Sequence, residues 1–211
     1  MALPDVRLLA IAGPPTVELP ALMDACRAAV AGGATAVQIR VKDVPAASLV
    51  QAAASLVATL PIPVYVNDRA DVAWAAGAQG VHVGWDDISP AAVRTFAGDA
   101  LRVGVSVGTP SEAVAALAAD VDYWSVGSVY ATATKPDAGA PIGTAGFRSL
   151  AARAPEGMSV IAIGGITAAN AAEVIEAGAC GVAVSSAIFS APNIAQAARA
   201  LREVVDRALS A

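Results

Sequence analysis

A short apolar segment near the N-terminus carries an amide and two cations at every second position. Gln38, Arg40 and Lys42 alternate there with aliphatic residues. Because successive side chains of a β-strand point to opposite faces, these three share one face. Cations on the inner face of a sheet are costly unless they are paired or bound to an anion. The pattern therefore favours an anion site, and a structural ion pair with nearby carboxylates is the alternative.

Carboxylates follow two later apolar segments. Asn67 and Asp68 come directly after one of them, and Asp87 follows the next one along the chain. Carboxylates from neighbouring loops, completed by substrate phosphate oxygens, are typical of magnesium sites. The sequence therefore favours Mg²⁺ at Asp68 together with one of the adjacent carboxylates Asp86 and Asp87, with a solvated acidic loop as the alternative. The only histidine, His82, is interpreted either as a base or as a hydrogen-bonded core residue, and ligands for zinc are lacking.

A long segment between residues 127 and 143 is bounded by glycine and proline. It contains Thr132, Thr134 and Lys135, which are two hydroxyls and one ammonium group in close succession. Long loops on a compact domain are commonly lids or binding loops. Two hydroxyl donors beside a point charge suit an anion, whereas an ordinary flexible surface loop is the alternative.

Two pairs of small residues near the C-terminus predict a phosphate site. Gly164 and Gly165 follow one apolar run, and Ser185 and Ser186 follow the next. Glycine lets backbone amides approach a phosphate closely. Barrel enzymes often build a phosphate site from the loops after their last two strands. This phosphate site and the anion site at the cationic segment make two sites in one protein. Two such sites predict a transfer between two phosphorylated small-molecule substrates.

The elements that must position these residues alternate between short β-rich runs and longer Ala-rich helical patterns. Eight strands in 211 residues predict an α/β protein, a single (β/α)₈ TIM barrel over residues 1–211. A doubly wound open sheet is the alternative. One sequence repeat begins at Ala31, Ala76 and Ala177, and a degenerate copy begins at Ala118. The repeat precedes every second expected strand, as duplication of a quarter barrel requires. The expected strands are 7–12, 36–41, 63–67, 80–84, 102–107, 123–127, 160–164 and 181–185.

Composition restricts the partners. The net charge is −5 and there is no basic run, which argues against nucleic acid and against an anionic membrane. No apolar stretch is long enough to span a bilayer, and the N-terminus lacks the pattern of a signal peptide. A cytoplasmic protein is therefore expected. Cys26 and Cys180 are interpreted as core residues, and the sequence leaves a homodimer open.

Six motifs in the same order resemble thiamine phosphate synthases. This resemblance implies a transferase that joins hydroxymethylpyrimidine diphosphate to thiazole phosphate and releases diphosphate. It covers almost the whole chain and rests on VQIRVKD (37–43), VNDRAD (66–71), GVHVGWDD (80–87), GVS (104–106), TATKPDA (132–138) and AIGGI (162–166).

The resemblance also implies roles for individual residues. Asp68 and Asp87 would hold Mg²⁺ on the diphosphate, and Lys135, Arg40 and Ser106 would be catalytic. The residues implied to bind the diphosphate and the pyrimidine are Gln38, Arg40, Lys42, Asn67, Ser106 and Lys135. The residues implied to bind the thiazole phosphate are Thr132, Thr134, Gly164, Gly165, Ser185 and Ser186.

Two positions depart from the pattern of that family. Trp85 stands where a glutamine is usual, and Gly108 stands where a histidine is usual. A related class, the thiazole tautomerases, would call for a histidine on the loop that holds Gly108. Non-catalytic binding of thiamine precursors on the same barrel is a third hypothesis, because a fold alone does not fix an activity.

Overall fold

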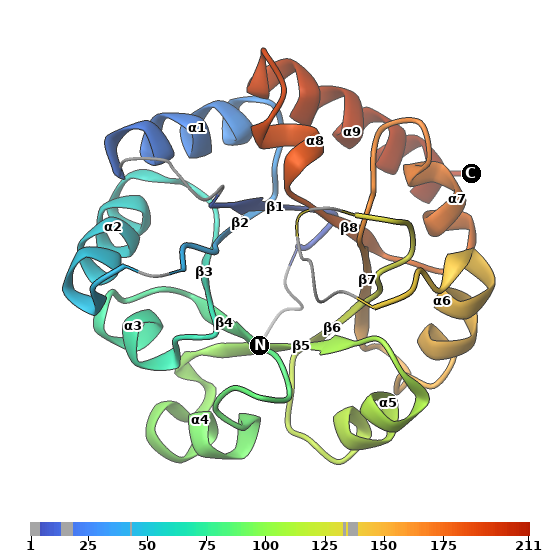
Figure 1. Ribbon diagram of the computed structural model, residues 1–211, viewed down its shortest axis with the longest axis horizontal. Helices are drawn as coiled ribbons and strands as arrows, with labels where there is room; N and C mark the ends of the chain where they lie inside the picture. The colour runs from blue at the N-terminus through green and yellow to red at the C-terminus, as the bar shows by residue number, and fades with distance from the viewer. Residues whose placement is uncertain (1–4, 14–18, 43, 133, 135–138) are drawn as a thin grey trace.

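Eight parallel strands close into a barrel. The computed structural model describes residues 5–13, 19–42, 44–132, 134 and 139–211. Each strand pairs with the next along the chain, and the eighth pairs with the first (Figure 1). This confirms the predicted TIM barrel. The strands are β1 (Leu8–Ala12), β2 (Ala36–Ile39), β3 (Val64–Asn67), β4 (Gly80–Val83), β5 (Arg102–Val107), β6 (Tyr123–Val126), β7 (Ser159–Ile163) and β8 (Gly181–Val184).

Helices surround the strands on the outside of the barrel (Figure 1). Ser89 caps α4, and Thr109 caps α5 in a reciprocal capping box with Glu112. Among the described helices, none is both long and apolar enough to cross a membrane. The helices are α1 (Leu19–Ala31), α2 (Ala46–Thr59), α3 (Ala70–Ala75), α4 (Pro90–Ala97), the 3₁₀ turn η1 (Gly98–Ala100), α5 (Pro110–Leu117), α6 (Gly143–Ala151), α7 (Ala171–Glu176), α8 (Ser186–Phe189) and α9 (Ile194–Leu209).

Alternation along the strands separates two apolar layers. One layer packs between strands and helices and contains residues such as Val66 and Trp124. The other fills the barrel interior, where the rings of Tyr65 and Tyr123 meet edge to face at 5.7 Å. The neighbouring strand makes room for Tyr123 with a glycine, because a Cβ on Gly104 would lie 2.0 Å from the tyrosine ring. The barrel interior is therefore a packed core.

Several strands end earlier than expected. The second strand was expected over 36–41, but β2 ends at Ile39, and Arg40 and Lys42 lie beyond it. The backbone N–H of Arg40 still donates to the carbonyl of Ala12 at 2.7 Å. Strand pairing with β3 stops at Ile39, so the cations project from a strand end instead of from within the sheet.

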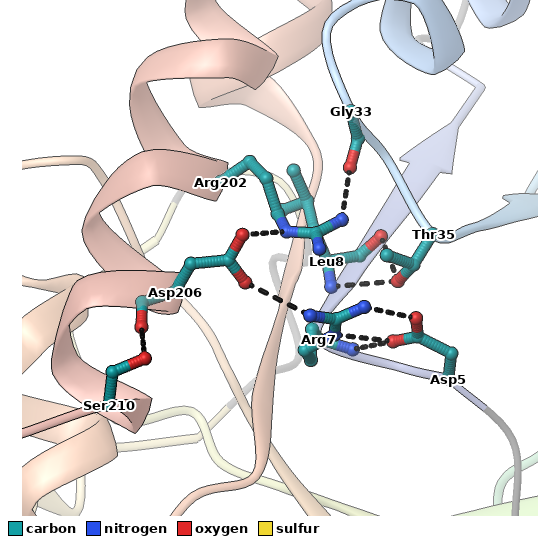
Figure 2. Close-up of polar contacts among 8 residues, drawn as sticks. All are labelled: Asp5, Arg7, Leu8, Gly33, Thr35, Arg202, Asp206 and Ser210. Carbon is teal, nitrogen blue, oxygen red and sulfur yellow. Dashed lines mark hydrogen bonds and ion pairs between the residues drawn. The ribbon is translucent and has the colours of Figure 1, made fainter.

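Ion pairs join the first strand to the last helix at the amino ends of the strands (Figure 2). Arg7 contacts Asp5 at 2.7 Å and Asp206 of α9 at 3.3 Å. Arg202 contacts Asp206 at 2.7 Å and donates to the Gly33 carbonyl at 3.0 Å. This network closes the ring of helices on the face opposite the strand carboxyl ends.

Candidate active site

A cavity of about 470 Å³ opens where the strands end. Its floor contains Ile11, Ile163 and Ala183 from three strands. Function is expected at this face of a (β/α)₈ barrel. The sequence-predicted residues that line the cavity are Arg40, Ser106, Thr132, Thr134, Gly164, Gly165, Ser185 and Ser186.

The loop after β6 crosses directly over the glycine pair. Gly164 and Gly165 have φ values of 96° and 65°, a region that favours glycine. A Cβ on Gly164 would lie 2.5 Å from Ser128, and a Cβ on Gly165 would lie 2.6 Å from the Ala131 carbonyl oxygen. The N–H of Tyr130 donates to the Gly164 carbonyl at 3.0 Å, which fixes the loop in this position. The glycines are therefore required by the close approach of two backbones.

Hydroxyl groups from two segments meet beside that crossing. The Thr134 Oγ1 lies 3.4 Å from the Oγ of Ser186, the first residue of α8. Thr132 Oγ1 accepts from the Thr134 N–H at 3.2 Å. Because these hydroxyls gather beside the glycine backbone, this side of the cavity offers several neutral donors to an anion. Lys135, predicted from the same motif, lies outside the described residues.

Asp68 and Asp87 form a like-charged pair beside the cations. Asp68 follows β3, and its backbone adopts the left-handed conformation, with φ of 63°. Burial, followed by the proximity of Asp87, raises the pKa of Asp68 from 3.8 to about 6, although Lys42 and Arg40 oppose this shift. Asp87 accepts a hydrogen bond from the Gly84 N–H at 2.8 Å.

This carboxylate pair fits a hard cation. A divalent ion between Asp68 and Asp87 would relieve the repulsion that holds the Asp68 pKa up. Within the described residues no cluster of three or more acidic, His or Cys side chains could hold a metal ion. An ion here would therefore need phosphate or water oxygens as further ligands, which is the usual situation of Mg²⁺.

His82 is buried inside the barrel and hydrogen-bonded at both ring nitrogens. Nδ1 lies 3.0 Å from the Tyr123 hydroxyl, and Nε2 lies 3.0 Å from the Ser106 Oγ. Gln38 is buried too and hydrogen-bonds Tyr123. Of the two interpretations of His82, these contacts favour the hydrogen-bonded core residue. They also connect Gln38, through Tyr123 and His82, to Ser106 in the cavity wall.

The remaining predicted residues occupy the side of the mouth near β2 and β3. Asn67 ends β3 and is half-buried, while Lys42 is exposed beyond β2. Neither residue lines the cavity, and neither do Gln38, Asp68 or Asp87. Arg40 bridges the two regions, since it lines the cavity and also acts on the Asp68 carboxyl. The site thus has a carboxylate side and a hydroxyl-and-glycine side, with Arg40 between them.

Both departures from the family pattern have structural reasons. The Trp85 Nε1 donates to the Ser106 carbonyl at 2.8 Å, which ties the loop after β4 to β5. Gly108 is close to a neighbouring backbone, because a Cβ there would lie 2.9 Å from the Gly127 carbonyl oxygen. In this chain a side chain at position 108 would therefore require the loop after β6 to move.

Sequence reasoning missed two polar residues of the cavity wall, Ser128 and Thr167, and one of its floor, Ser125. It lies in β6, where Tyr123 and Ser125 are two positions apart and share the interior face. Strand alternation could have found it, but its neighbours Trp124 and Val126 made the run look wholly apolar.

Residues 8–188 of the chain match the family described as thiamine monophosphate synthase. A thiamine-phosphate synthase of Moorella thermoacetica is 46% identical over 199 residues, which cover 93% of this chain and 91% of that relative. One of Xanthobacter autotrophicus is 46% identical over 204 residues, covering 95% of this chain and 96% of the relative. The structure of a thiamine phosphate pyrophosphorylase from Pyrococcus furiosus superposes with a TM-score of 0.84 at 32% identity, covering 96% and 97% of the two chains. The chain belongs to the thiamine monophosphate synthase family.

Proposed function

We propose that this chain is a thiamine-phosphate synthase that transfers the pyrimidine-methyl group of hydroxymethylpyrimidine diphosphate to thiazole phosphate. The bond between the methylene carbon and the diphosphate oxygen breaks, and its electron pair leaves with diphosphate. The thiazole nitrogen then forms a new bond to the same carbon, which gives thiamine phosphate. The observation that carries this proposal is the two-sided mouth, with cations and carboxylates on one side and hydroxyls and glycines on the other.

The carboxylate side suits the diphosphate. Asp68 and Asp87 would hold Mg²⁺, and Arg40, Lys42, Asn67 and Lys135 would contact diphosphate oxygens. When bound, the ion neutralises negative charge that builds up on the leaving group. Arg40 contributes in the same way, because it stays charged and can donate two parallel hydrogen bonds.

The hydroxyl side suits the phosphate of the thiazole. The hydroxyls of Thr134 and Ser186 lie close together, and Gly164 and Gly165 line the same cavity. Thr132 and Ser185 complete the set proposed for this phosphate. A phosphate held there leaves the thiazole ring facing the cavity floor, toward Ser106 and the diphosphate side.

The cavity offers little for general acid–base chemistry. Among its described lining residues Arg40 is the only one with a charged side chain, and none is a carboxylate or an imidazole. A displacement in which diphosphate departs first needs no protein base, since the thiazole nitrogen attacks with its own lone pair. Catalysis would then rest on charge neutralisation and on positioning of the two rings.

The test is product formation. Purified protein, Mg²⁺ and the two substrates should yield thiamine phosphate, measured as thiochrome fluorescence. Asp68→Ala and Lys135→Ala should each lower kcat/KM by about 10²–10³-fold, as loss of an electrostatic contact to the transition state does. Asp99→Ala and Arg27→Ala, which change exposed charges away from the mouth, serve as matched controls. Folded protein that forms no thiamine phosphate would refute the proposal.

The two alternative activities make different predictions. A tautomerase would isomerise the thiazole substrate without the pyrimidine. The histidine expected of that class is absent, because position 108 is glycine, and a Cβ added there would lie 2.9 Å from the Gly127 carbonyl oxygen. A non-catalytic binder would bind both precursors and release no diphosphate. Incubation with each substrate alone and with both together separates the three activities.

We also propose that the protein works in the cytoplasm as a homodimer. The exposed rings of Trp74 on α3 and Phe96 on α4 stack edge to face at 6.1 Å, which supports an apolar contact surface. Sedimentation velocity of the native protein and of Trp74→Glu tests the assembly. A native monomer would contradict it.

A further inference from the structure

One hydroxyl on the cavity floor lacks a hydrogen-bond partner. Within the described residues, the buried side-chain atoms without a partner are Tyr65 Oη, Trp124 Nε1 and Ser125 Oγ. Of these three residues, only Ser125 lines the cavity, and it is 2% exposed. A buried hydroxyl without a partner is costly, and such groups in native proteins commonly mark a place that a ligand or water completes.

The surroundings of Ser125 indicate the chemistry of that ligand. In the β5–β6 register Ser125 is the direct partner of Ser106, so two hydroxyls lie side by side. The Ser106 hydroxyl already contacts His82 at 3.0 Å, whereas the Ser125 hydroxyl has no hydrogen-bond partner. The rest of the floor is aliphatic, with Ile11 and Ile163 among its residues. Apolar walls with a hydroxyl edge suit a flat heteroaromatic ring better than a phosphate.

The anion-binding groups lie elsewhere in the mouth. Arg40 lies between the two sides and acts on the Asp68 carboxyl, and Thr134 and Ser186 lie on the hydroxyl side. Ser125 is on β6, between the strand of Ser106 and the strand of Ile163, and is therefore under the region where the two rings must meet.

We propose that the Ser125 hydroxyl donates a hydrogen bond to a ring nitrogen of the pyrimidine, beside Ser106. This contact fixes the rotation of the ring about its own axis and so aims the methylene carbon at the thiazole nitrogen. Ser125 is then a specificity-determining residue of the pyrimidine substrate. The inference rests on the proposed function, because it names one contact of that substrate.

The test compares Ser125→Ala with Ser159→Ala. Ser159 is also buried in a strand, but it begins β7, at the end of the barrel away from the mouth. Calorimetric titration with hydroxymethylpyrimidine diphosphate in Mg²⁺ should show about tenfold weaker binding to Ser125→Ala, the size expected for one hydrogen bond in a dry site. Thiazole phosphate should bind the variant as it binds the native protein, and Ser159→Ala should leave both affinities unchanged.

A second ligand isolates the ring nitrogen. Benzyl diphosphate has the same leaving group on a ring without nitrogen, so its affinity should be equal for the native protein and Ser125→Ala. The ligand-free variant should also unfold at the same temperature as the native protein or at a higher one, because an unpaired buried hydroxyl has been removed. A purely structural role for Ser125 predicts a lower temperature instead.

Three results would overturn the inference. These are unchanged affinity for the pyrimidine substrate, an equal loss for benzyl diphosphate, and a lower unfolding temperature with equal losses for both substrates. Failure of the proposed function itself looks different, since the native protein would then form no thiamine phosphate. Because binding is measured without turnover, the two failures are distinguishable.

Discussion

Replacement of Asp68 by asparagine should stabilise the metal-free protein while it lowers turnover. The native carboxyl has its pKa raised from 3.8 to about 6 by burial and by Asp87. The folded protein therefore holds a proton at Asp68 more tightly than the unfolded chain does, and ionisation at neutral pH destabilises the fold. Asparagine removes the charge and can still donate a hydrogen bond to Asp87. It also tolerates the left-handed backbone of position 68, where φ is 63°.

The magnitude follows from the shift. A rise from 3.8 to about 6, at about 1.4 kcal/mol per pKa unit, corresponds to about 3 kcal/mol at most. Asp68 is only half-buried, so solvent screening lowers this to about 1–2 kcal/mol. The destabilisation by ionised Asp68 is complete above pH about 6 and fades as the pH falls toward 3.8. At pH about 4.5 it should therefore be about a third of its value at neutral pH.

Urea denaturation in EDTA measures this effect. Asp68→Asn should be more stable than the native protein by about 1–2 kcal/mol at pH about 7.5, and the gain should shrink at pH about 4.5. Asp99→Asn, on the exposed turn η1, should show neither change. Saturating Mg²⁺ should stabilise the native protein but not Asp68→Asn. A variant that is less stable in EDTA at neutral pH, or a gain independent of pH, would refute the reasoning.

Three further substitutions test the framework by urea denaturation, and a fourth, Arg27→Ala, serves as a control. Arg94→Ala should cost about 2–3 kcal/mol, because this side chain is 14% exposed and donates to the Leu101 carbonyl at 2.7 Å. The exposed Arg27→Ala should change stability by less than about 0.5 kcal/mol. Thr109→Ala removes the capping box of α5 and should cost about 1 kcal/mol; no loss would mean that the cap is dispensable. Gly104→Ala should cost more than about 3 kcal/mol, and a well-folded variant would contradict the packing around Tyr123.

The sequence was sufficient for the number and order of the strands, because eight apolar runs alternate with helical patterns. It was less reliable for strand ends. The second strand was expected to reach residue 41, yet β2 ends at Ile39. A strand continues only while its neighbour offers backbone partners, and the register of β2 with β3 cannot be read from β2 alone.

Charge directed attention to most of the site but not to its floor. Asp68 and Arg40 stand out because ionised groups are unexpected after buried strands. Ser125 does not, since an uncharged hydroxyl among Trp124 and Val126 resembles ordinary strand filler. Its significance comes from a missing hydrogen-bond partner, which only coordinates can reveal. The structural reason for a glycine at position 108 is likewise visible only in the coordinates. It is the proximity of the Gly127 carbonyl oxygen, which is distant in the sequence.

The contact between Arg7 and Asp206 bears on how the chain could be rearranged. It brings the start of β1 beside α9, on the face of the barrel away from the cavity (Figure 2). Proteins whose first and last elements adjoin are suited to circular permutation. A short linker from α9 to β1 could be combined with an opening at Gly157, an exposed turn where an added Cβ would meet nothing within 4 Å. Both junctions would then lie on that same face, and the permuted barrel would keep its mouth intact.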